Sequence, residues 1–314
     1  MKKLYTLFFI TFAGATFAQQ SLPFSDSFSY PAGNLHETAP WSALGTPHAA
    51  DHILLDGSKV TFDGLGTDTQ VLITSQTSGT VFYRINLNVL SMTGVTDVNG
   101  GYLAGFTQNS TTFGGTLWTK RVDDTNFNLG IETRTATGAN TTYTAASYST
   151  GTPLTIVVAY TFNTGTTSDD TVRMWVNPTS GDEGSPLLTD IHSGTDLTSI
   201  VSFFLRQDSA TETPSVTVDD LKVSLTFNEV LSASSFNAIE GLTMYPNPLK
   251  GNTLYLTSTA NADMSIQIFD LIGKEVLNSN VINNSVNVSS LNAGVYIVKV
   301  TEEGKTATRK LVIQ

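Results

Sequence analysis

Alternation of apolar and polar residues with a period of two most limits what this chain can fold into. Between residues 81 and 89, apolar side chains occupy every second position: Val81, Tyr83, Ile85, Leu87 and Val89. Such a pattern is typical of a strand with one buried face. Residues 154–162 are almost continuously apolar or β-branched, as in a strand covered on both faces. No helix-capped stretch of about 12 or more residues follows the N-terminal segment, so the sequence predicts an all-β sandwich architecture.

The first segment has the pattern of an export signal. Two lysines precede the apolar run Leu4–Phe12, and Thr16 and Ala18 supply the small residues that signal peptidase reads. We expect cleavage after Ala18, so that residues 1–18 are a signal peptide. A membrane anchor built from the same run is the alternative, although the run is shorter than the roughly 20 residues that span a bilayer. No later run approaches that length, and we expect no transmembrane segment in the mature chain.

Charge divides the chain into two modules. Residues 19–241 contain eight Lys/Arg against 22 Asp/Glu, a balance of −14, whereas residues 242–314 contain six against five, a balance of +1. Between them, residues 229–241 are rich in small side chains and lack strand alternation, which is typical of a linker. We therefore expect a large module at 19–228 and a small one at 242–314.

Composition excludes several functions. The chain has no cysteine, which rules out a disulfide scaffold, a zinc–cysteine site and a thiol nucleophile. Its formal charge of −11 and the lack of a basic block argue against nucleic acid as a partner. Hydrophobic residues make up 40%, enough for a packed core.

The C-terminal block carries a series of ordered motifs. They are Met244-Tyr-Pro-Asn-Pro248 with Gly251, the strands Leu254–Leu256 and Ile266–Val276, Leu291–Val300, and the closing Arg309-Lys-Leu-Val-Ile313. In this order and spacing the block resembles the C-terminal sorting domain of type IX secretion system (Por) cargo. An ordinary immunoglobulin-like binding domain is the alternative.

The resemblance implies a small immunoglobulin-like sandwich that directs cargo across the outer membrane of Bacteroidetes-type bacteria. It implies the type IX secretion machinery and its surface protease as partners, and an extracellular or outer-membrane surface location reached through the periplasm. The positions that match the motifs are Tyr245, Pro246, Asn247, Pro248, Gly251, Asp270, Gly273, Gly294, Tyr296 and Lys310. Their chemistry is structural: the prolines stiffen the start of the module, residues 270–273 form a turn, and Gly294 allows a tight backbone before Tyr296.

The larger module also carries recognisable segments. They are Phe24–Leu35 leading to Trp41, Asn126–Ile131, Tyr160–Gly165, Met174–Pro178 and Val218–Val223. Together these resemble the concanavalin-like (laminin-G-type) jelly rolls of secreted Bacteroidetes proteins. The resemblance implies a large jelly-roll β-sandwich, a fold that lectins, adhesive modules and glycosidases share. Function must therefore be argued from a site.

Catalytic motifs are missing from the sequence. The pattern Glu-x-Asp-x-x-Glu of jelly-roll glycosidases does not occur, and neither does a Gly-x-Ser-x-Gly elbow or a P-loop. His36 and Glu37 begin like a zinc-protease helix, but Pro40 stands where the second histidine is needed. His48 and His52 have helical spacing within a segment that is better interpreted as a surface loop. No catalytic residue is predicted.

Acidic residues suggest one structural calcium site. Asp219 and Asp220 interrupt the alternation of their strand, which predicts a bulge that places a carboxylate beside the strand of Asp26. A cation held by these three residues would relieve repulsion within the acidic module. Two solvated turn aspartates are the alternative. Residues 124–130 have the ligand spacing of a calcium loop, but we favour a strand there because Gly130 is one place late.

Three tryptophans are candidates for stacking on sugar rings, and Trp118, close to two basic residues, is the predicted ligand-binding residue. Burial in the core is the alternative. We expect a non-catalytic, exported module that binds a neutral glycan or matrix, because a strongly acidic surface repels polyanions. The alternative is a polysaccharide hydrolase with an acid/base pair chosen from Glu132, Asp170 and Asp208.

Overall fold

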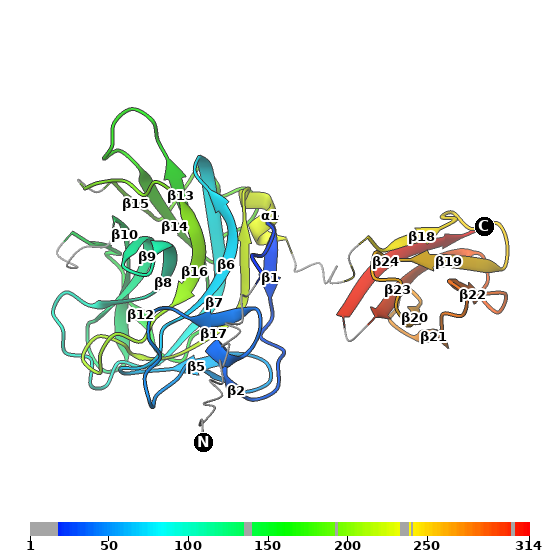
Figure 1. The fold of residues 1–314 in the computed structure, drawn as a ribbon, viewed down its shortest axis with the longest axis horizontal. Coiled ribbons are helices and arrows are strands. Elements are labelled where there is room, and N and C mark those ends of the chain that lie inside the picture. The colour runs from blue at the N-terminus through cyan, green and yellow to red at the C-terminus, as the bar shows by residue number, and fades with distance from the viewer. Residues whose placement is uncertain (1–17, 135–139, 192–193, 233–238, 240, 303–304) are drawn as a thin grey trace, which may run out of the picture. The chain divides into compact units, whose positions relative to one another are not determined.

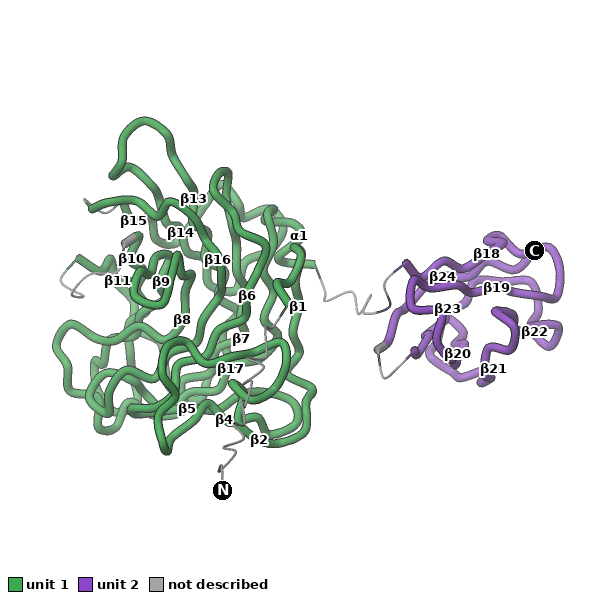
Figure 2. Tube along the Cα trace, in the orientation of Figure 1, with its two compact units in different colours: residues 1–232 green, residues 233–314 purple. Residues whose placement is uncertain are grey.

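The computed structural model describes residues 18–134, 140–191, 194–232, 239, 241–302 and 305–314. The chain divides into two compact units, residues 1–232 and 233–314 (Figures 1 and 2). The expected signal peptide lies almost entirely outside the described residues. Among the helices that the structure describes, none is long and apolar enough to cross a membrane.

The larger unit contains a nine-stranded antiparallel sheet, in which β1 (Phe24–Asp26) pairs with β17. The other strands follow in the order β15 (Leu188–Asp190), β14 (Thr171–Val176), β13 (Leu154–Phe162), β7 (Gly79–Ser91), β17 (Ser215–Ser224), β5 (Val60–Phe62), β4 (Leu54–Leu55) and β2 (Gly33–Asn34). The central pairs join segments far apart in the chain, so this sheet forms only when its whole module folds.

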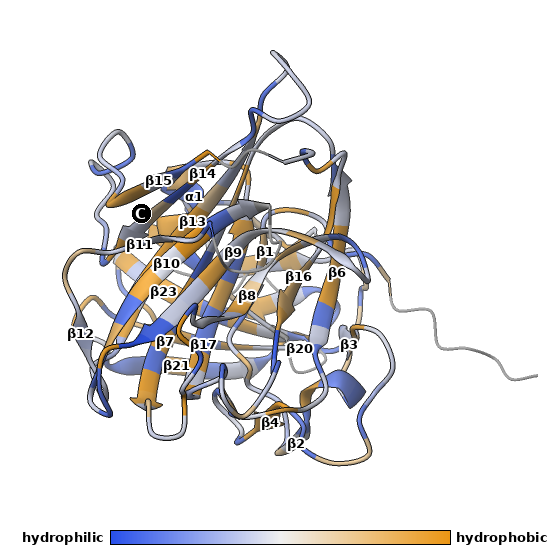
Figure 3. Cartoon of the chain, turned by 90° about the vertical axis from the view of Figure 1, so that its left-hand side faces the viewer, coloured by the Kyte–Doolittle hydropathy of each residue, from blue (hydrophilic) through white to orange (hydrophobic). Residues whose placement is uncertain are grey.

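The second sheet of this unit has eight strands, of which β12 (Tyr148–Ser149) pairs with β10. The other strands follow in the order β11 (Thr142–Tyr143), β10 (Asn126–Arg134), β9 (Thr112–Arg121), β8 (Gly101–Asn109), β16 (Ile200–Leu205), β6 (Thr69–Gln76) and β3 (Trp41–Ala43). Figure 3 looks onto this sheet, and β10, β9, β8, β16 and β6 succeed one another across the view. The strand favoured for residues 126–130 is confirmed.

One apolar core lies between the two sheets. The alternating residues expected on β7, from Val81 to Val89, are all buried there. They pack with inward-facing side chains of the other sheet, such as Phe106, Leu129 and Phe203. Burial of large apolar side chains contributes about 1.5–3 kcal/mol each, so this layer dominates the stability of the unit. The large β-sandwich expected from the sequence is confirmed.

The bulge expected at Asp219 and Asp220 is present. The pairing of β17 with β7 shifts register between Asp219 and Lys222, and Asp220 has a φ of +50°. The same strand pairs with β1 on its other side, where Asp26 lies opposite Leu221. The bulge in β17 and the position of β1 beside it, both predicted from the sequence, are therefore confirmed.

The linker begins later than predicted. Residues 227–231 form a short helix, α1 (Phe227–Leu231), whose N-cap Thr226 accepts a hydrogen bond from the Glu229 amide. Phe227 and Val230 lie on one helical face and pack on Phe82 and Trp175, on the outer side of the nine-stranded sheet. The predicted linker start at Glu229 is wrong, because a single apolar turn of helix is too short to produce a visible period.

The smaller unit is a second, smaller pair of antiparallel sheets. One sheet contains β18 (Thr243–Tyr245), β19 (Thr253–Thr257) and β22 (Ser285–Asn287). The other contains, in order, β21 (Glu275–Asn280), β20 (Met264–Phe269), β23 (Gly294–Glu302) and β24 (Lys305–Ile313). Leu254, Ile266 and Val298 belong to one core that both sheets share. The small all-β sandwich expected here is confirmed.

Candidate functional site

The eight-stranded sheet carries a two-tier aromatic cluster on the face that points away from the core. Trp118 of β9 and Phe204 of β16 are buried at 4% and 0% exposure and form the lower tier. Tyr102 and Phe113 are half-buried and lie over them. The Tyr102 ring centroid lies 5.0 Å from that of Trp118, and the Phe113 centroid lies 5.1 Å from that of Phe204.

A glycine makes room for the lower tier. Gly105 of β8 pairs directly with Phe204 of β16. A Cβ atom at Gly105 would lie 3.1 Å from the Phe204 ring and 3.0 Å from the Cα of Thr116. Because neither neighbour has space to retreat, Gly105 is what allows the Phe204 ring to lie close to the sheet.

Arg206 covers the aromatic cluster. Its guanidinium carbon lies 4.6 Å from the Tyr102 ring centroid and 5.7 Å from that of Phe113, both within the range of cation–π attraction. Its Nη1 donates to Asp68 Oδ2 at 3.1 Å, and its Nη2 donates to Asp208 Oδ1 at 2.6 Å. The planar guanidinium is therefore fixed in position by two carboxylates at its edge and by aromatic rings near its face.

A loop after β16 brings a third carboxylate to the same place. The Glu212 amide donates to the Ser209 carbonyl at 3.2 Å, and the Ser209 hydroxyl donates to Glu212 Oε2 at 3.2 Å. The Thr211 carbonyl accepts hydrogen bonds from the amides of Thr96 and Asp97, which anchors the loop to the connection between β7 and β8. Glu212 lies near enough to Asp208 for that carboxyl group to raise its pKa.

Asp68 and Glu212 hold their protons more tightly than usual, because their pKa values are raised. Burial raises the pKa of Asp68 to about 6, although the Arg206 charge opposes the shift. Burial and the neighbouring Asp208 raise the pKa of Glu212 to about 7. Carboxyl groups with shifted pKa values are concentrated at functional sites, although networks of ion pairs also shift them. At neutral pH the cluster presents aromatic surface, a fixed cation and a partly protonated set of oxygen acceptors.

Trp118 is not the exposed platform that the sequence predicted. Its indole Nε1 donates to Thr116 Oγ1 at 2.9 Å, and its ring is covered by Tyr102. Trp118 therefore supports the cluster from beneath, and Tyr102, Phe113 and Arg206, all partly exposed, share its outer surface. The sequence prediction considered only tryptophans as sugar-binding residues. Tyr102 lies on β8 and Arg206 directly follows β16, and no sequence motif marks either of them as part of a site.

The three predicted calcium ligands all accept hydrogen bonds from the protein. Asp26 accepts hydrogen bonds from the Phe28 amide, the Tyr30 hydroxyl and the Trp41 indole at 2.7, 2.9 and 2.8 Å. Asp220 accepts from Arg84 at 2.5 Å, and Asp219 accepts from the Asp220 amide at 2.7 Å. Protein donors therefore already engage each carboxylate, and the three do not make up the compact carboxylate group that the described residues contain, so the calcium site stays a prediction from the sequence.

One other carboxylate group is compact enough to consider. Asp169, Asp170 and Asp196 each offer an oxygen within 4.8 Å of the others, and no other such group occurs in the described parts of the chain. Backbone amides already occupy much of this group. Asp196 accepts from the amides of Asp169 and Asp170 at 3.0 and 3.1 Å. These hydrogen bonds explain why the three carboxylates lie together: Asp196 caps the turn that precedes β14.

The three carboxylates considered for hydrolysis are dispersed. Asp170 lies at the edge of the nine-stranded sheet, where it accepts from the Tyr160 hydroxyl at 2.5 Å and the Asn163 amide at 2.6 Å. Glu132 is fully buried on β10, and Asp208 follows β16. Strands β10 and β16 are separated by two others, which is three strand spacings or about 14 Å. The carboxylates of glycosidases lie about 5–9.5 Å apart, so Glu132 and Asp208 do not make such a pair.

The histidines singled out in the sequence do not form a helix. His36 lies in a single 3-10 turn, and His52 makes an isolated bridge to Thr67. The interpretation of His48 and His52 as part of a loop is confirmed. The rings of His36 and His52 are 4.9 Å apart, and burial together with His52 lowers the pKa of His36.

In the smaller unit, Asn247 holds the closing strand. Its Nδ2 donates to the Lys310 carbonyl at 2.7 Å, and its Oδ1 accepts from the Val312 amide at 3.0 Å. Tyr245 stacks on Tyr255 with centroids 5.6 Å apart, and both rings are exposed. Pro246 and Pro248 flank Asn247 within this segment, and Gly251 follows in an exposed turn. The predicted motif therefore builds one edge of the unit.

The predicted turn at residues 270–273 is confirmed. Asp270 Oδ1 accepts from the amides of Ile272 and Lys274, both at 3.0 Å, and Gly273 has a φ of +83°. Gly294 differs from expectation, because a Cβ atom there would meet only the Tyr296 ring, at an ordinary 3.5 Å. The Tyr296 hydroxyl instead fixes the bend before β23 by donating to the Asn292 carbonyl at 2.9 Å.

The fold defines the class of the chain, an all-β protein in which a large antiparallel sandwich precedes a small one. Within it, residues 243–314 match the family model described as "Secretion system C-terminal sorting domain". The C-terminal unit is thus a sorting domain, as its motifs predicted. It marks the chain as exported cargo of the type IX system, destined for the cell surface or the extracellular space.

The chain is similar to several solved structures at low sequence identity. Alginate lyase Aly36B is 14% identical with a TM-score of 0.42, over 66% of this chain and 98% of that one. An endo-1,3-beta-glucanase from Streptomyces sioyaensis is 15% identical with a TM-score of 0.38, over 64% and 94%. The Emp47p carbohydrate recognition domain is 12% identical with a TM-score of 0.33, over 67% and 99%. No curated protein matches the chain in sequence.

Proposed function

We propose that the larger unit binds a neutral glycan through the outer face of its eight-stranded sheet and does not cleave it. The observation that carries the proposal is the position of Arg206 over Tyr102 and Phe113, held in place by Asp68 and Asp208. Half-buried aromatic rings supply flat apolar surface for the C–H faces of sugar rings. Carboxylates and a guanidinium supply acceptors and donors for hydroxyl groups.

The charge of the site favours a neutral ligand over an acidic one. Around Arg206 lie three carboxyl groups, Asp68, Asp208 and Glu212, in a module with a balance of −14 over residues 19–241. A polyuronate would meet this negative field over the Debye length of about 8 Å at physiological salt. Export by the sorting domain delivers the unit to the cell surface or the extracellular space.

Hydrolysis is the second candidate, and one observation favours it. Burial and the neighbouring Asp208 raise the pKa of Glu212 to about 7, as in a carboxyl group that donates a proton at neutral pH. Against it, the sequence lacks the Glu-x-Asp-x-x-Glu pattern of jelly-roll glycosidases, and the strands that lead to Glu132 and Asp208 are three strand spacings apart. The binding role is therefore the better supported of the two.

The test combines retention and release. The mature chain is passed over insoluble neutral polysaccharides (cellulose, curdlan, xylan and mannan) and over cross-linked alginate, and the soluble reducing sugar is then measured. We expect retention on at least one neutral polymer, little on alginate, and no sugar release. Release by the wild type that is lost in Glu212→Gln would favour the hydrolase. Retention on alginate alone would contradict the neutral ligand.

A further inference from the structure

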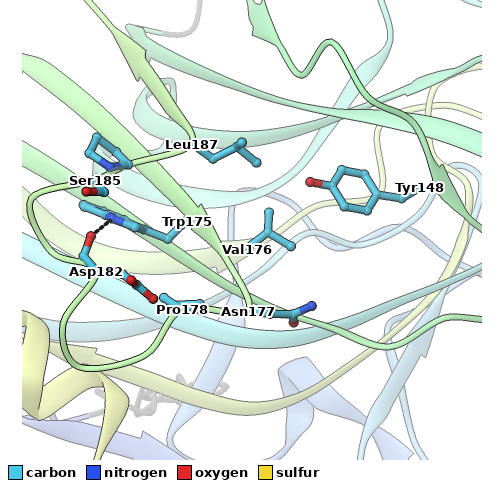
Figure 4. A pocket seen from close by; sticks show the side chains of 9 residues that line it. Tyr148, Trp175, Val176, Asn177, Pro178, Asp182, Ser185 and Leu187 are labelled. Atoms are coloured by element: carbon cyan, nitrogen blue, oxygen red, sulfur yellow. Dashed lines mark hydrogen bonds between the residues drawn. The ribbon is translucent and has the colours of Figure 1, made fainter.

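A cavity of about 570 Å³ opens in the larger unit, and no residue of the aromatic cluster lines it (Figure 4). Its lining comes from both sheets. Tyr148 belongs to β12, which is paired into the eight-stranded sheet, whereas Trp175 and Val176 end β14 of the nine-stranded sheet. Asp182, Ser185 and Leu187 belong to the connection between β14 and β15.

The apolar walls of the cavity are fixed by packing. The Tyr148 ring lies 6.1 Å from the buried Phe127 ring, with an angle of 37° between their planes. Figure 4 shows Tyr148 on one side of the cavity, with Trp175 and Leu187 on the other and Val176 between. Leu187 is 50% exposed, so its side chain presents apolar surface at the mouth.

Hydrogen bonds fix the polar side of the cavity. The Trp175 indole Nε1 donates to the Asp182 carbonyl at 2.8 Å, and the Ser185 amide donates to the same carbonyl at 2.9 Å. Asp182 Oδ2 accepts from the amide and the hydroxyl of Thr179 at 2.7 and 2.9 Å. These bonds, the backbone one first, lower the pKa of Asp182, so its carboxylate is ionised at neutral pH. A loop held in this way loses little freedom when a ligand binds.

We propose that this cavity is a second saccharide site that takes a neutral sugar of one or two rings. Its volume falls within the range of about 300–1,000 Å³ that is usual for small-molecule sites. The Tyr148 ring and Leu187 offer apolar contact to a ring face, while Asp182 and Ser185 offer an acceptor and a hydroxyl to ring hydroxyls. The fixed negative charge of Asp182 disfavours sugar acids. The proposal goes beyond the aromatic face and does not depend on it.

The test titrates the mature chain with short neutral sugars, namely cellobiose, laminaribiose, maltose and mannobiose, by calorimetry. Ser185 is exposed, so Ser185→Phe fills the cavity without disturbing the core. Ser180→Phe is the matched control, because Ser180 is exposed in the same connection and does not line the cavity. Tyr148→Ala removes the ring wall, with the melting temperature as the check on folding.

We expect saturable binding of at least one disaccharide that weakens about tenfold or more in Ser185→Phe and is unchanged in Ser180→Phe, a loss of about 1.4 kcal/mol or more. Saturable binding of none of the four sugars would overturn the proposal, as would equal binding by wild type and Ser185→Phe. Tyr102→Ala separates the two sites, because it alters the aromatic face and none of the residues that line the cavity. If Tyr102→Ala abolishes that binding while Ser185→Phe does not, the cavity proposal fails and the aromatic face is supported.

Discussion

The side-chain amide of Asn247 is hydrogen-bonded to the backbone carbonyl of Lys310, 63 residues later, at 2.7 Å. The same side chain accepts from the Val312 amide at 3.0 Å, so it pairs with the edge of β24 as a neighbouring strand would. The Leu249 amide continues the pairing by donating to the Val312 carbonyl at 2.7 Å. The first segment of the sorting domain thus protects the edge of its last strand.

Replacing Asn247 should therefore loosen the closing strand. In Asn247→Ala the Val312 amide loses its acceptor, and we expect its hydrogen exchange to accelerate and the free energy of unfolding of the smaller unit to fall by about 1–2 kcal/mol. Lys310→Ala is the matched control, because the bond uses the Lys310 backbone and survives the substitution. Equal protection of Val312 in Asn247→Ala and wild type would contradict this role. Amide exchange measured by NMR decides the question.

Trp118 should behave as a buried residue. We expect Trp118→Ala to lower the free energy of unfolding by about 3–5 kcal/mol, because it removes a large ring from beneath Tyr102 and leaves a cavity. Urea denaturation followed by circular dichroism measures the change. A loss of less than about 1 kcal/mol would return Trp118 to the exposed position that the sequence predicted.

Asp26 should act as a structural acceptor rather than a cation ligand. Asp26→Ala leaves the buried Trp41 indole and the Phe28 amide without their acceptor, and we expect a loss of about 3 kcal/mol or more. Denaturation midpoints with added calcium or with chelator serve as the check on the metal. Stabilisation of wild type by calcium that disappears in Asp219→Asn would contradict the assignment.

The stability of the larger unit should decline as the pH rises toward neutral. Burial raises the pKa of Asp68 from 3.8 to about 6 and that of Glu212 from 4.5 to about 7. Between about pH 4 and pH 7 the folded state therefore keeps protons that the unfolded chain has released, and stability falls across that window. Melting temperatures measured from about pH 5 to pH 8 should decline less steeply in Glu212→Gln than in wild type. Parallel profiles would show that Glu212 does not titrate in this window.

The sequence was a good guide wherever a short-range pattern had one structural solution. The alternation over residues 81–89 gave a strand and its buried face, and the double aspartate at 219–220 gave a bulge beside β1. The turn at residues 270–273 followed from Asp and Gly at fixed spacing. In each case the physical cause lies within about ten residues.

The candidate site could not be predicted from the sequence, because its residues are brought together by strand pairing over long sequence distances. Arg206 and Tyr102 are about a hundred residues apart and meet only because β16 pairs with β8. Register decides which side chains face outward, and glycine bulges shift that register within β8 and β9. For the same reason the sequence does not reveal that donors from other strands and turns engage Asp26 and Asp220, two residues of the calcium prediction.

The most direct test of the central claim is the affinity of the aromatic face for a neutral glycan. Affinity electrophoresis in gels containing the retained polysaccharide compares wild type with Phe113→Ala and Tyr102→Ala. Tyr255→Ala is the matched control, because it removes an exposed ring from the smaller unit. We predict that both substitutions on the face abolish retardation, while Tyr255→Ala migrates like wild type and all variants remain folded. Unchanged retardation of folded Tyr102→Ala and Phe113→Ala would contradict the account.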